Sequence, residues 1–432
     1  MRRLLTVLAF ASPVLAGDVD DPSAGGWQKI FALLPPGSEL KGVMLPRYDE
    51  NHKLIGVLKS ESVILVDATR VTGRGVSFEL FNPDQSPKGR VDLVNATIYQ
   101  KSELITTRDP VVIKTDRMQA VGCGLYYSFG GKSGFLHKGF LVGPATTTIL
   151  PPPIETTMNT PVIPLRATAM IGVSLLTQSL TASPPPAVSP AEIAAIQADA
   201  ASKAPAAAAS VTAARSSLKT DLADADTASK AAAAFLVQAD LPPVPPAVPS
   251  AAAKPLDVKP GLGDTVINCE GGMYFDPDEG VLVYLKNVTV KDPRFDLSGA
   301  NELKIFFGKK PAKQTKDKSQ SAKPDKSKSG FGGDIGANFG DVERIVANGA
   351  IVLDQKPTDA GKEPIKASGA LFSYNLKADQ ITISGGYPWV LQGATFLRAK
   401  EPELILRISP GAGSFVTEGH WEMGGKIDQK KK

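Results

Sequence analysis

The chain has 432 residues, which is enough for two or three domains. It contains three His and two Cys, and no Ser-hydrolase, zinc-protease, P-loop or dinucleotide-binding motif. We therefore expect a protein that is not an enzyme, with no catalytic residues, no metal and no cofactor.

The N-terminus resembles an export signal. Met1, Arg2 and Arg3 form a basic start, and the 13 residues from Leu4 to Ala16 are mostly apolar and end in small residues. That run is shorter than the roughly 20 residues of a membrane-spanning helix. The pattern predicts a cleavable signal peptide over residues 1–16 and a periplasmic protein, with an uncleaved membrane anchor as the alternative.

Residues 38–146 alternate between apolar and polar side chains in short runs, separated by Gly, Asn, Asp and Pro. The run from Val76 to Phe81 is the clearest example. This spacing is typical of an all-β sandwich or roll. The side chains expected to face an apolar groove in this first β domain are Val76, Phe78, Leu80, Ile98, Leu125, Tyr127 and Phe135.

Residues 147–254 form a Pro- and Ala-rich linker with a predicted helix. Ser189-Pro190-Ala191-Glu192 is a capping box with Pro at the first helical position. We expect Pro205 to break or kink the helix, and residues 206–238 to resume it. Because this helix has few large apolar residues, we predict an exposed spacer, with disorder as the alternative.

Residues 255–427 return to the alternating pattern and predict a second β domain. Its groove candidates are Ile267, Met273, Phe275, Leu282, Tyr284, Ile351, Leu353, Leu371, Ile381 and Ile383.

A Lys-rich insert, residues 309–333, interrupts a predicted hairpin of the second domain and is expected to be disordered. Its residues 309–328 hold eight Lys and two Asp, so the remaining chain is net negative despite a total formal charge of +4. No aromatic residue lies among these lysines, which argues against nucleic acid as a partner. Contact with an anionic membrane surface is the better expectation for this insert.

A short refrain recurs in both β segments: a small residue and Gly, then Tyr or Phe, then a polar turn and alternating apolar residues. Such self-similarity predicts a stack of equivalent β units. Cys123 and Cys269 occupy equivalent places in the refrain. We therefore expect two buried, unbridged cysteines that pack as small apolar residues.

The residues also resemble a known family. Lys41-Gly42-Val43, Arg47-Tyr48-Asp49-Glu50 and the run from Val76 to Phe81 resemble the LptC-type lipopolysaccharide-transport domain. Residues 341–353 and 365–386 resemble the LptA/OstA (organic solvent tolerance) domain. The resemblance implies two β-jellyroll (β-taco) domains that shield lipid acyl chains and join other Lpt-type β-jellyroll proteins by edge-strand addition.

Two functions follow as expectations. The first is a periplasmic bridge component for lipopolysaccharide, or a related glycolipid, that serves outer-membrane biogenesis. The alternative is a structural or scaffolding envelope protein with closed β cores and edge-strand partners. The two differ in one physical property, because a lipid groove must have room that a core packed to interior density lacks.

Overall fold

The computed structural model describes residues 34–48, 53–67, 69–81, 85–115, 117–128, 138–151, 190–238, 261, 263–309, 339–357 and 363–425. The predicted signal peptide, Phe135 and residues 310–333 of the Lys-rich insert lie outside these residues. The chain divides into two compact units, residues 1–151 with 217–432 and residues 152–216. The described part of the second unit is helical, and the strands all belong to the first unit.

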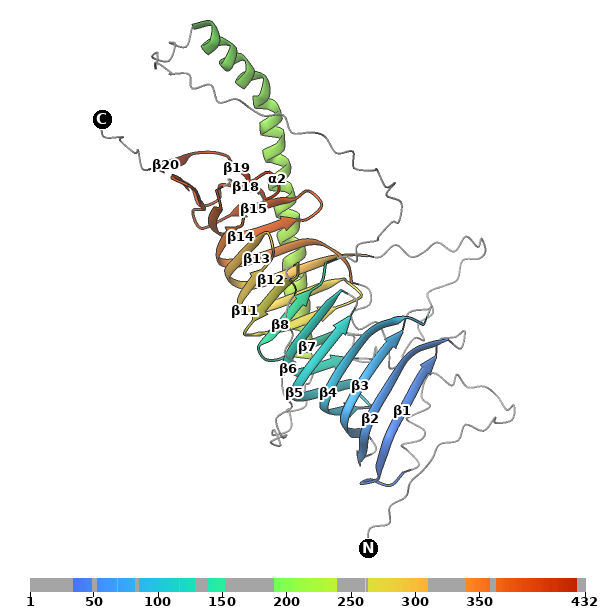
Figure 1. Cartoon of the computed structure of the whole chain (residues 1–432). Helices are drawn as coiled ribbons and strands as arrows, with labels where there is room; N and C mark the ends of the chain where they lie inside the picture. The colour runs from blue at the N-terminus through green and yellow to red at the C-terminus, as the bar shows by residue number, and fades with distance from the viewer. Residues whose placement is uncertain are drawn as a thin grey trace, which may run out of the picture. The chain divides into compact units, whose positions relative to one another are not determined.

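The described residues of the first unit are all-β, as predicted, apart from the helical residues 217–238, and the antiparallel strands form one continuous sheet (Figure 1). The strands from the first β segment are β1 Glu39–Tyr48, β2 Leu54–Asp67, β3 Arg70–Phe81, β4 Pro87–Tyr99, β5 Leu104–Thr115, β6 Met118–Ser128, β7 Lys138–Leu141 and β8 Ala145–Ile149. Those from the second are β9 Thr265–Cys269, β10 Gly272–Asp276, β11 Val281–Lys291, β12 Phe295–Lys309, β13 Phe339–Gln355, β14 Ile365–Asn375, β15 Gln380–Ser384, β16 Trp389–Gln392, β17 Thr395–Ala399, β18 Leu406–Ser409, β19 Ser414–Thr417 and β20 Trp421–Gly425.

The long strands contribute one half to each of two layers. In β6, residues 118–122 pair with β8, whereas residues 125–128 pair with β7. In β14, residues 365–368 pair with β16 and residues 371–375 pair with β15. We call the layer that contains β8, β9 and β16 the first layer, and the one that contains β7, β10 and β15 the second layer.

The line along which the strands pass from one layer to the other, here called the bend, coincides with breaks in the pairing register. Glycines with positive φ lie on it, among them Gly272 (φ 110°) and Gly299 (φ 77°). A Cβ atom on Gly299 would overlap the carbonyl oxygen of Ala350 on the neighbouring strand. Glycine is therefore required there both by the backbone conformation and by the close approach of two strands.

The two predicted β segments meet within the same sheet. β8 pairs with β9 from Ala145–Cys269 to Ile149–Thr265, and β7 pairs with β10 through Phe140 and Tyr274. The first pairing lies in the first layer and the second in the second layer. Both layers are thus continuous across the junction, which we call the intrachain joint.

The Lys-rich insert joins two paired strands. β12 and β13 are paired as far as Lys309 and Phe339, which are the described residues on either side of residues 310–338. The two strands thus form the hairpin that the sequence predicts around the insert.

In the part of the chain that the structure describes, the helix α2 runs from Pro190 to Gln238. It begins at the proline that the capping box predicts. Of the break or kink predicted at Pro205, the break is wrong, because the helix continues through this residue. A proline removes one backbone donor and crowds one carbonyl, and the Ala-rich sequence on both sides favours helix strongly enough to compensate.

The prediction of an exposed spacer is also wrong for residues 217–238. Their buried positions follow one another at alternating spacings of three and four residues, as on the apolar side of an amphipathic helix. These buried positions are Leu218, Asp221, Ala225, Ala228, Ala232 and Phe235.

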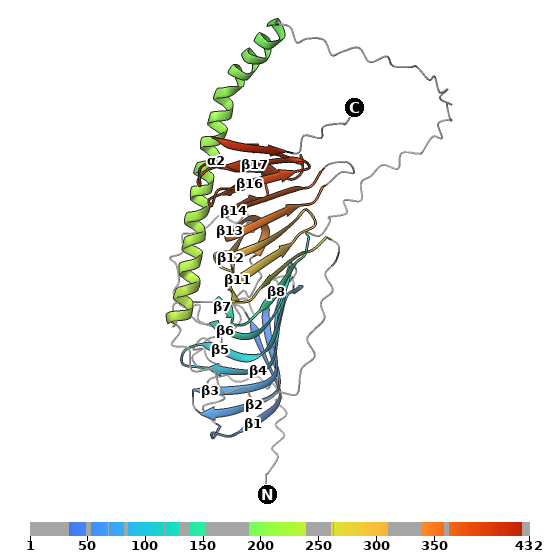
Figure 2. The same cartoon turned by 90° about the vertical axis from the view of Figure 1, so that its left-hand side faces the viewer.

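This part of α2 packs on the outer face of the second layer and crosses its strands (Figure 2). Ala228, Ala232 and Phe235 form one apolar cluster with Tyr126, Phe140, Tyr274, Val281 and Val283. Most contributions from the helix are small residues, which let its backbone approach the sheet closely. The large apolar groups come from the sheet, and a count of large residues in the helix alone therefore missed the packing.

Candidate functional site: the apolar interior between the layers

The strands direct alternate side chains into the space between the two layers. On β11, Leu282 and Tyr284 point into this interior and are fully buried, while Val281 and Val283 pack on the outer face beneath α2. One connected set of buried apolar side chains extends from Leu58 on β2 to Ile408 on β18. The interior is therefore shared by both predicted β segments.

Fifteen of the groove candidates belong to this interior cluster, with side chains that are at most 7% exposed. They are Val76, Phe78, Leu80, Ile98, Leu125, Tyr127, Ile267, Met273, Phe275, Leu282, Tyr284, Ile351, Leu353, Ile381 and Ile383.

Leu371 is different. It is only partly buried and lies outside the interior cluster, whereas its neighbours Phe372 and Tyr374 are fully buried members of it. On β14 successive side chains face opposite sides of the sheet, so Phe372 and Tyr374 share one face and Leu371 lies on the other. The sequence Ala370-Leu371-Phe372 is apolar on both faces, and pattern alone does not determine which side of it faces inward.

Several interior residues were absent from the sequence-based set, among them Val91 and Leu93 on β4, Ile105 and Ile113 on β5, and Phe295 on β12. Val91 and Leu93 alternate with Arg90 and Asp92, and this pattern could have placed them in the interior. Ile113 follows Val111 and Val112, and this apolar run gives no such signal.

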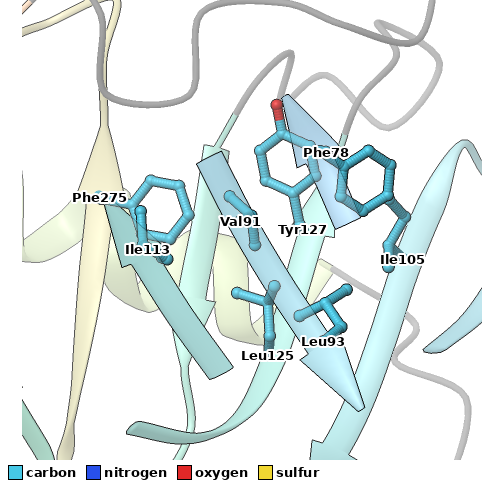
Figure 3. Close-up of a pocket in the computed structure, with 8 residues that line it drawn as sticks. All are labelled: Phe78, Val91, Leu93, Ile105, Ile113, Leu125, Tyr127 and Phe275. Atoms are coloured by element: carbon cyan, nitrogen blue, oxygen red, sulfur yellow. The ribbon is translucent and has the colours of Figure 1, made fainter. Parts of the chain in front are cut away.

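A small apolar cavity lies between the layers in the first β segment (Figure 3). Its volume is about 10 Å³, roughly the space of one water-sized probe. Phe275 reaches it from the second β segment and stacks on Tyr127 with ring centroids 6.2 Å apart. The lining residues are Phe78, Val91, Leu93, Ile105, Ile113, Leu125, Tyr127 and Phe275.

A few polar groups lie in the interior beside the intrachain joint. The Thr147 hydroxyl donates to the Met273 Sδ atom at 3.3 Å, and the Cys269 thiol donates to the Gly272 carbonyl oxygen at 3.3 Å. Burial raises the pKa of Cys269 and also that of Tyr284, which is fully buried. These groups are therefore neutral at physiological pH, so this part of the interior carries no charge.

The two cysteines are both unbridged but differ in exposure: Cys269 is buried and Cys123 is exposed. The expectation that both are buried is wrong for Cys123. Cys123 lies at the bend between Gly122 and Gly124, whereas Cys269 lies at the end of β9, one residue before Glu270 and Gly271. At the bend, a different face of the strand points into the interior. Two cysteines at equivalent positions of the refrain can therefore differ in burial.

The acidic stretch 276–279 forms the turn between β10 and β11. The Glu279 backbone N–H donates to Asp276 Oδ1 at 3.2 Å, and Lys138 Nζ lies 2.8 Å from Asp276 Oδ2. Within the part of the chain that the structure describes, no group of three or more His, Cys, Asp or Glu could hold a metal ion.

Among the described residues, the sheet has strand edges without a pairing partner at both ends. β1 pairs with β2, and its inward residues Leu40, Val43 and Leu45 are only partly buried. Met44 on the same strand is 61% exposed. At the other end, β19 pairs with β18 and β20 with β17. The described helical residues contain no segment of the length and hydropathy that a membrane crossing requires.

No protein-family model and no curated protein matches the chain. Among solved structures, the chain is similar to LptH, described as the LptA homologous periplasmic component of the lipopolysaccharide transport device from Pseudomonas aeruginosa. The similarity covers 38% of this chain and 94% of that chain, at 13% sequence identity and a TM-score of 0.27.

Proposed function

We propose that this chain carries an acylated lipid, lipopolysaccharide or a related glycolipid, through the periplasm with the acyl chains between its two layers. The observation that supports this proposal is the connected apolar interior, which extends from Leu58 to Ile408 through both β segments. Apolar surface that is shielded from water on both sides is a suitable environment for hydrocarbon chains. The sequence resemblance to Lpt-type domains points in the same direction.

The open edges suit a bridge. The strand edges of β1, β19 and β20 offer backbone donors and acceptors to a further strand. We propose other Lpt-type β-jellyroll proteins as the partners at these edges. The predicted signal peptide supports a periplasmic location, and contact of the Lys-rich insert with an anionic membrane surface is part of the same proposal.

An acyl chain needs a movement of the layers to enter this interior, because buried side chains fill it and the cavity beside Phe275 has room for about one water-sized probe. Separation of the layers would leave their connection along the bend intact. Lipid binding therefore requires a transition from a filled to an open interior, in which acyl chains replace contacts between the layers.

A scaffold with a closed core is the second candidate, and the full burial of interior side chains is the observation that supports it. Leu282, Tyr284 and Leu353 are fully buried, as expected for an interior that stays closed. In this case the protein would bind its partners through the strand edges and would carry no lipid.

Photocrosslinking distinguishes the two functions. A photoreactive amino acid at Phe78 or Leu353 probes the interior in the two β segments, and the full-length protein is mixed with purified lipopolysaccharide. Asp92 and Asp354 serve as controls, since they alternate with inward residues on β4 and β13 and are more than a third exposed at the side chain. Adducts at an interior position and none at the controls support transport. A folded protein without interior adducts would establish the scaffold.

A further inference from the structure

The edges of the two layers opposite the bend form what we call the mouth of the interior. In the second β segment, the first layer brings its turns 291–295 and 392–395 and the strand ends at Gln355 and Ile365 to the mouth, and the second layer brings turns 375–380 and 409–414. Side chains cross from one layer to the other at this place.

The central crossing joins Arg294 and Tyr374. Arg294 Nη1, on the first layer, donates to the Tyr374 hydroxyl oxygen of the second layer at 2.7 Å. The Tyr374 hydroxyl donates in turn to Asp379 Oδ1 at 3.0 Å. The Phe295 ring meets the Tyr374 ring edge-on, with centroids 5.6 Å apart, directly inside this hydrogen bond. Polar contact at the mouth and apolar contact beneath it thus hold the same two strands together.

Arg294 is fixed in position by its own layer. Its Nε and Nη2 atoms donate to the two carboxylate oxygens of Asp292 at 2.8 and 3.1 Å. Asp292 is 3% exposed and also accepts a hydrogen bond from the Thr265 hydroxyl at 2.7 Å. A two-point contact of this kind holds the planar guanidinium in one orientation, so Arg294 is preorganised to reach Tyr374.

Two further contacts cross the mouth beside the first. Gln355 Nε2 on the first layer donates to the Pro410 carbonyl oxygen of the second at 3.1 Å. Gln392 Nε2 donates to the Gly413 carbonyl oxygen at 3.3 Å. Asp379 connects these contacts to the central crossing, since its Oδ2 atom accepts from the Gly411 backbone N–H at 2.8 Å.

We propose that Arg294, Tyr374, Gln355 and Gln392 form a latch that keeps the second half of the lipid path closed and that opens when acyl chains enter it. This inference rests on the proposed function, since it assigns regulation to the same interior. A latch made of a few hydrogen bonds is suited to this role. The net contribution of each hydrogen bond is modest, so together they can keep an empty interior closed and can still be offset by the burial of the many CH₂ groups of an acyl chain.

The variant that tests the latch is Tyr374→Phe. It removes the hydroxyl and both its hydrogen bonds but keeps the ring that packs on Phe295. Tyr274→Phe is the matched control, because it also removes a buried hydroxyl that donates to a carboxylate, that of Asp276 at 3.2 Å, but on the outer face of the second layer. Asp379→Asn, which weakens the same crossing, serves as a second latch variant if Tyr374→Phe does not fold.

The first readout is the photocrosslinking yield of lipopolysaccharide at Leu353 relative to that at Phe78. We expect Tyr374→Phe to increase this ratio at least about threefold, and Tyr274→Phe to leave it unchanged. An unchanged ratio in Tyr374→Phe, with adducts at Phe78 present, overturns the latch and leaves the proposed function intact.

The second readout needs no lipid. Spin labels at the exposed residues Pro357 and Lys377, on opposite sides of the mouth, report the distance between the layers in a protein whose two native cysteines are replaced. We expect Tyr374→Phe to add a population with a longer distance, and lipopolysaccharide to enlarge it. Absence of adducts at both Phe78 and Leu353 would refute the proposed function. The spin-label distances test the latch separately, and identical distances in Tyr374→Phe and in the parent protein would refute the latch.

Discussion

Asp221 on α2 and Arg344 on β13 form an ion pair beneath the helix, with Arg344 Nη1 2.5 Å from Asp221 Oδ1. The same Asp221 carboxylate accepts a hydrogen bond from the Ser373 hydroxyl of β14, and Arg344 also contacts Asp224 at 2.8 Å. The Arg344 guanidinium lies 4.3 Å from the centre of the Phe306 ring. Burial opposes the charge on Arg344, but its hydrogen bonds with Asp224 and Asp221 outweigh burial and raise its pKa. This group fixes where α2 lies on the sheet.

Asp221→Ala is therefore expected to loosen α2. The substitution leaves a partly buried Arg344 with one carboxylate fewer, which should cost about 1–3 kcal/mol. Hydrogen exchange should become faster in residues 217–238 and in β13. Asp226→Ala is the control, because Asp226 is 62% exposed at the side chain and contacts Lys230 on the same helix. Its effect should stay below about 0.5 kcal/mol, and an equal effect of the two substitutions would contradict the assignment.

Phe235→Ala tests the apolar contact between α2 and the intrachain joint. Phe235 is 1% exposed and lies 5.8 Å from the Tyr274 ring, measured between centroids. Truncation of a buried Phe costs about 3–5 kcal/mol where the site cannot collapse, and urea denaturation would measure it. Val237→Ala, at an 80% exposed position of the same helix, should change the free energy of unfolding very little.

The inward register of β14 can be tested with two adjacent substitutions. Phe372→Asp places a carboxylate in the interior and should destabilise the protein by at least about 4 kcal/mol or prevent folding. Leu371→Asp, at the partly buried outer position, should leave a folded protein. Thermal unfolding followed by circular dichroism compares them. The reverse order of effects would mean that Leu371 faces the interior, as the sequence pattern suggested.

The bend makes a prediction about glycine. Gly299→Ala combines an unfavourable φ of 77° with an overlap against the Ala350 carbonyl, and should cost at least about 2 kcal/mol. Gly263→Ala is the control, because the atom nearest to a Cβ at this position would be Pro151 Cγ, at 3.8 Å. That substitution should be nearly neutral in the same denaturation experiment.

Acid should weaken the mouth of the second β segment. Burial alone would raise the pKa of Asp292, but hydrogen bonds from Arg294 and Thr265 outweigh it and hold the pKa below its ordinary value. A carboxyl with a depressed folded-state pKa stabilises the fold above its unfolded value of about 3.9, and this contribution is lost as pH falls below that value through the folded pKa.

The test is Asp292→Asn, followed by urea denaturation between pH 7 and pH 3. We expect a loss of about 1–3 kcal/mol at pH 7 that shrinks below pH 4 as the parent protein loses the same interaction. Asp354→Asn, at an exposed position 3.9 Å from Lys366 Nζ, is the control and should have little effect at pH 7. A difference between Asp292→Asn and the parent that stays constant over the whole range would contradict the pKa assignment.

The sequence predicted the fold class well because alternation reports which side chains can be buried on a strand. It predicted Phe78 and Ile381 as inward residues, and both belong to the interior cluster, since polar residues alternate with apolar ones around them. The recurring small residue and Gly are explained by the bend, where Gly124 and Gly272 adopt positive φ. The aromatic residues that follow these glycines begin the second layer.

Pattern is ambiguous where a segment is apolar on both faces, and it failed at Leu371. This residue was predicted to face the interior, but its neighbour Phe372 belongs to the interior cluster instead. The packing of α2 was missed for a related reason, because Ala228 and Ala232 reveal nothing in isolation. Their burial depends on Phe140 and Val283, residues that are distant in the sequence. The small cavity and the contacts across the mouth depend on tertiary geometry that no local pattern carries.

The intrachain joint has a consequence for how the protein responds to dilution. Two β units on separate chains that meet edge to edge would dissociate as their concentration falls. Here β7 with β10 and β8 with β9 belong to one polypeptide, so their pairing is governed by an effective concentration set by the tether and not by protein abundance. The two β segments are consequently present in a fixed ratio of one to one, and their junction persists in a cell that makes only a few copies of the chain.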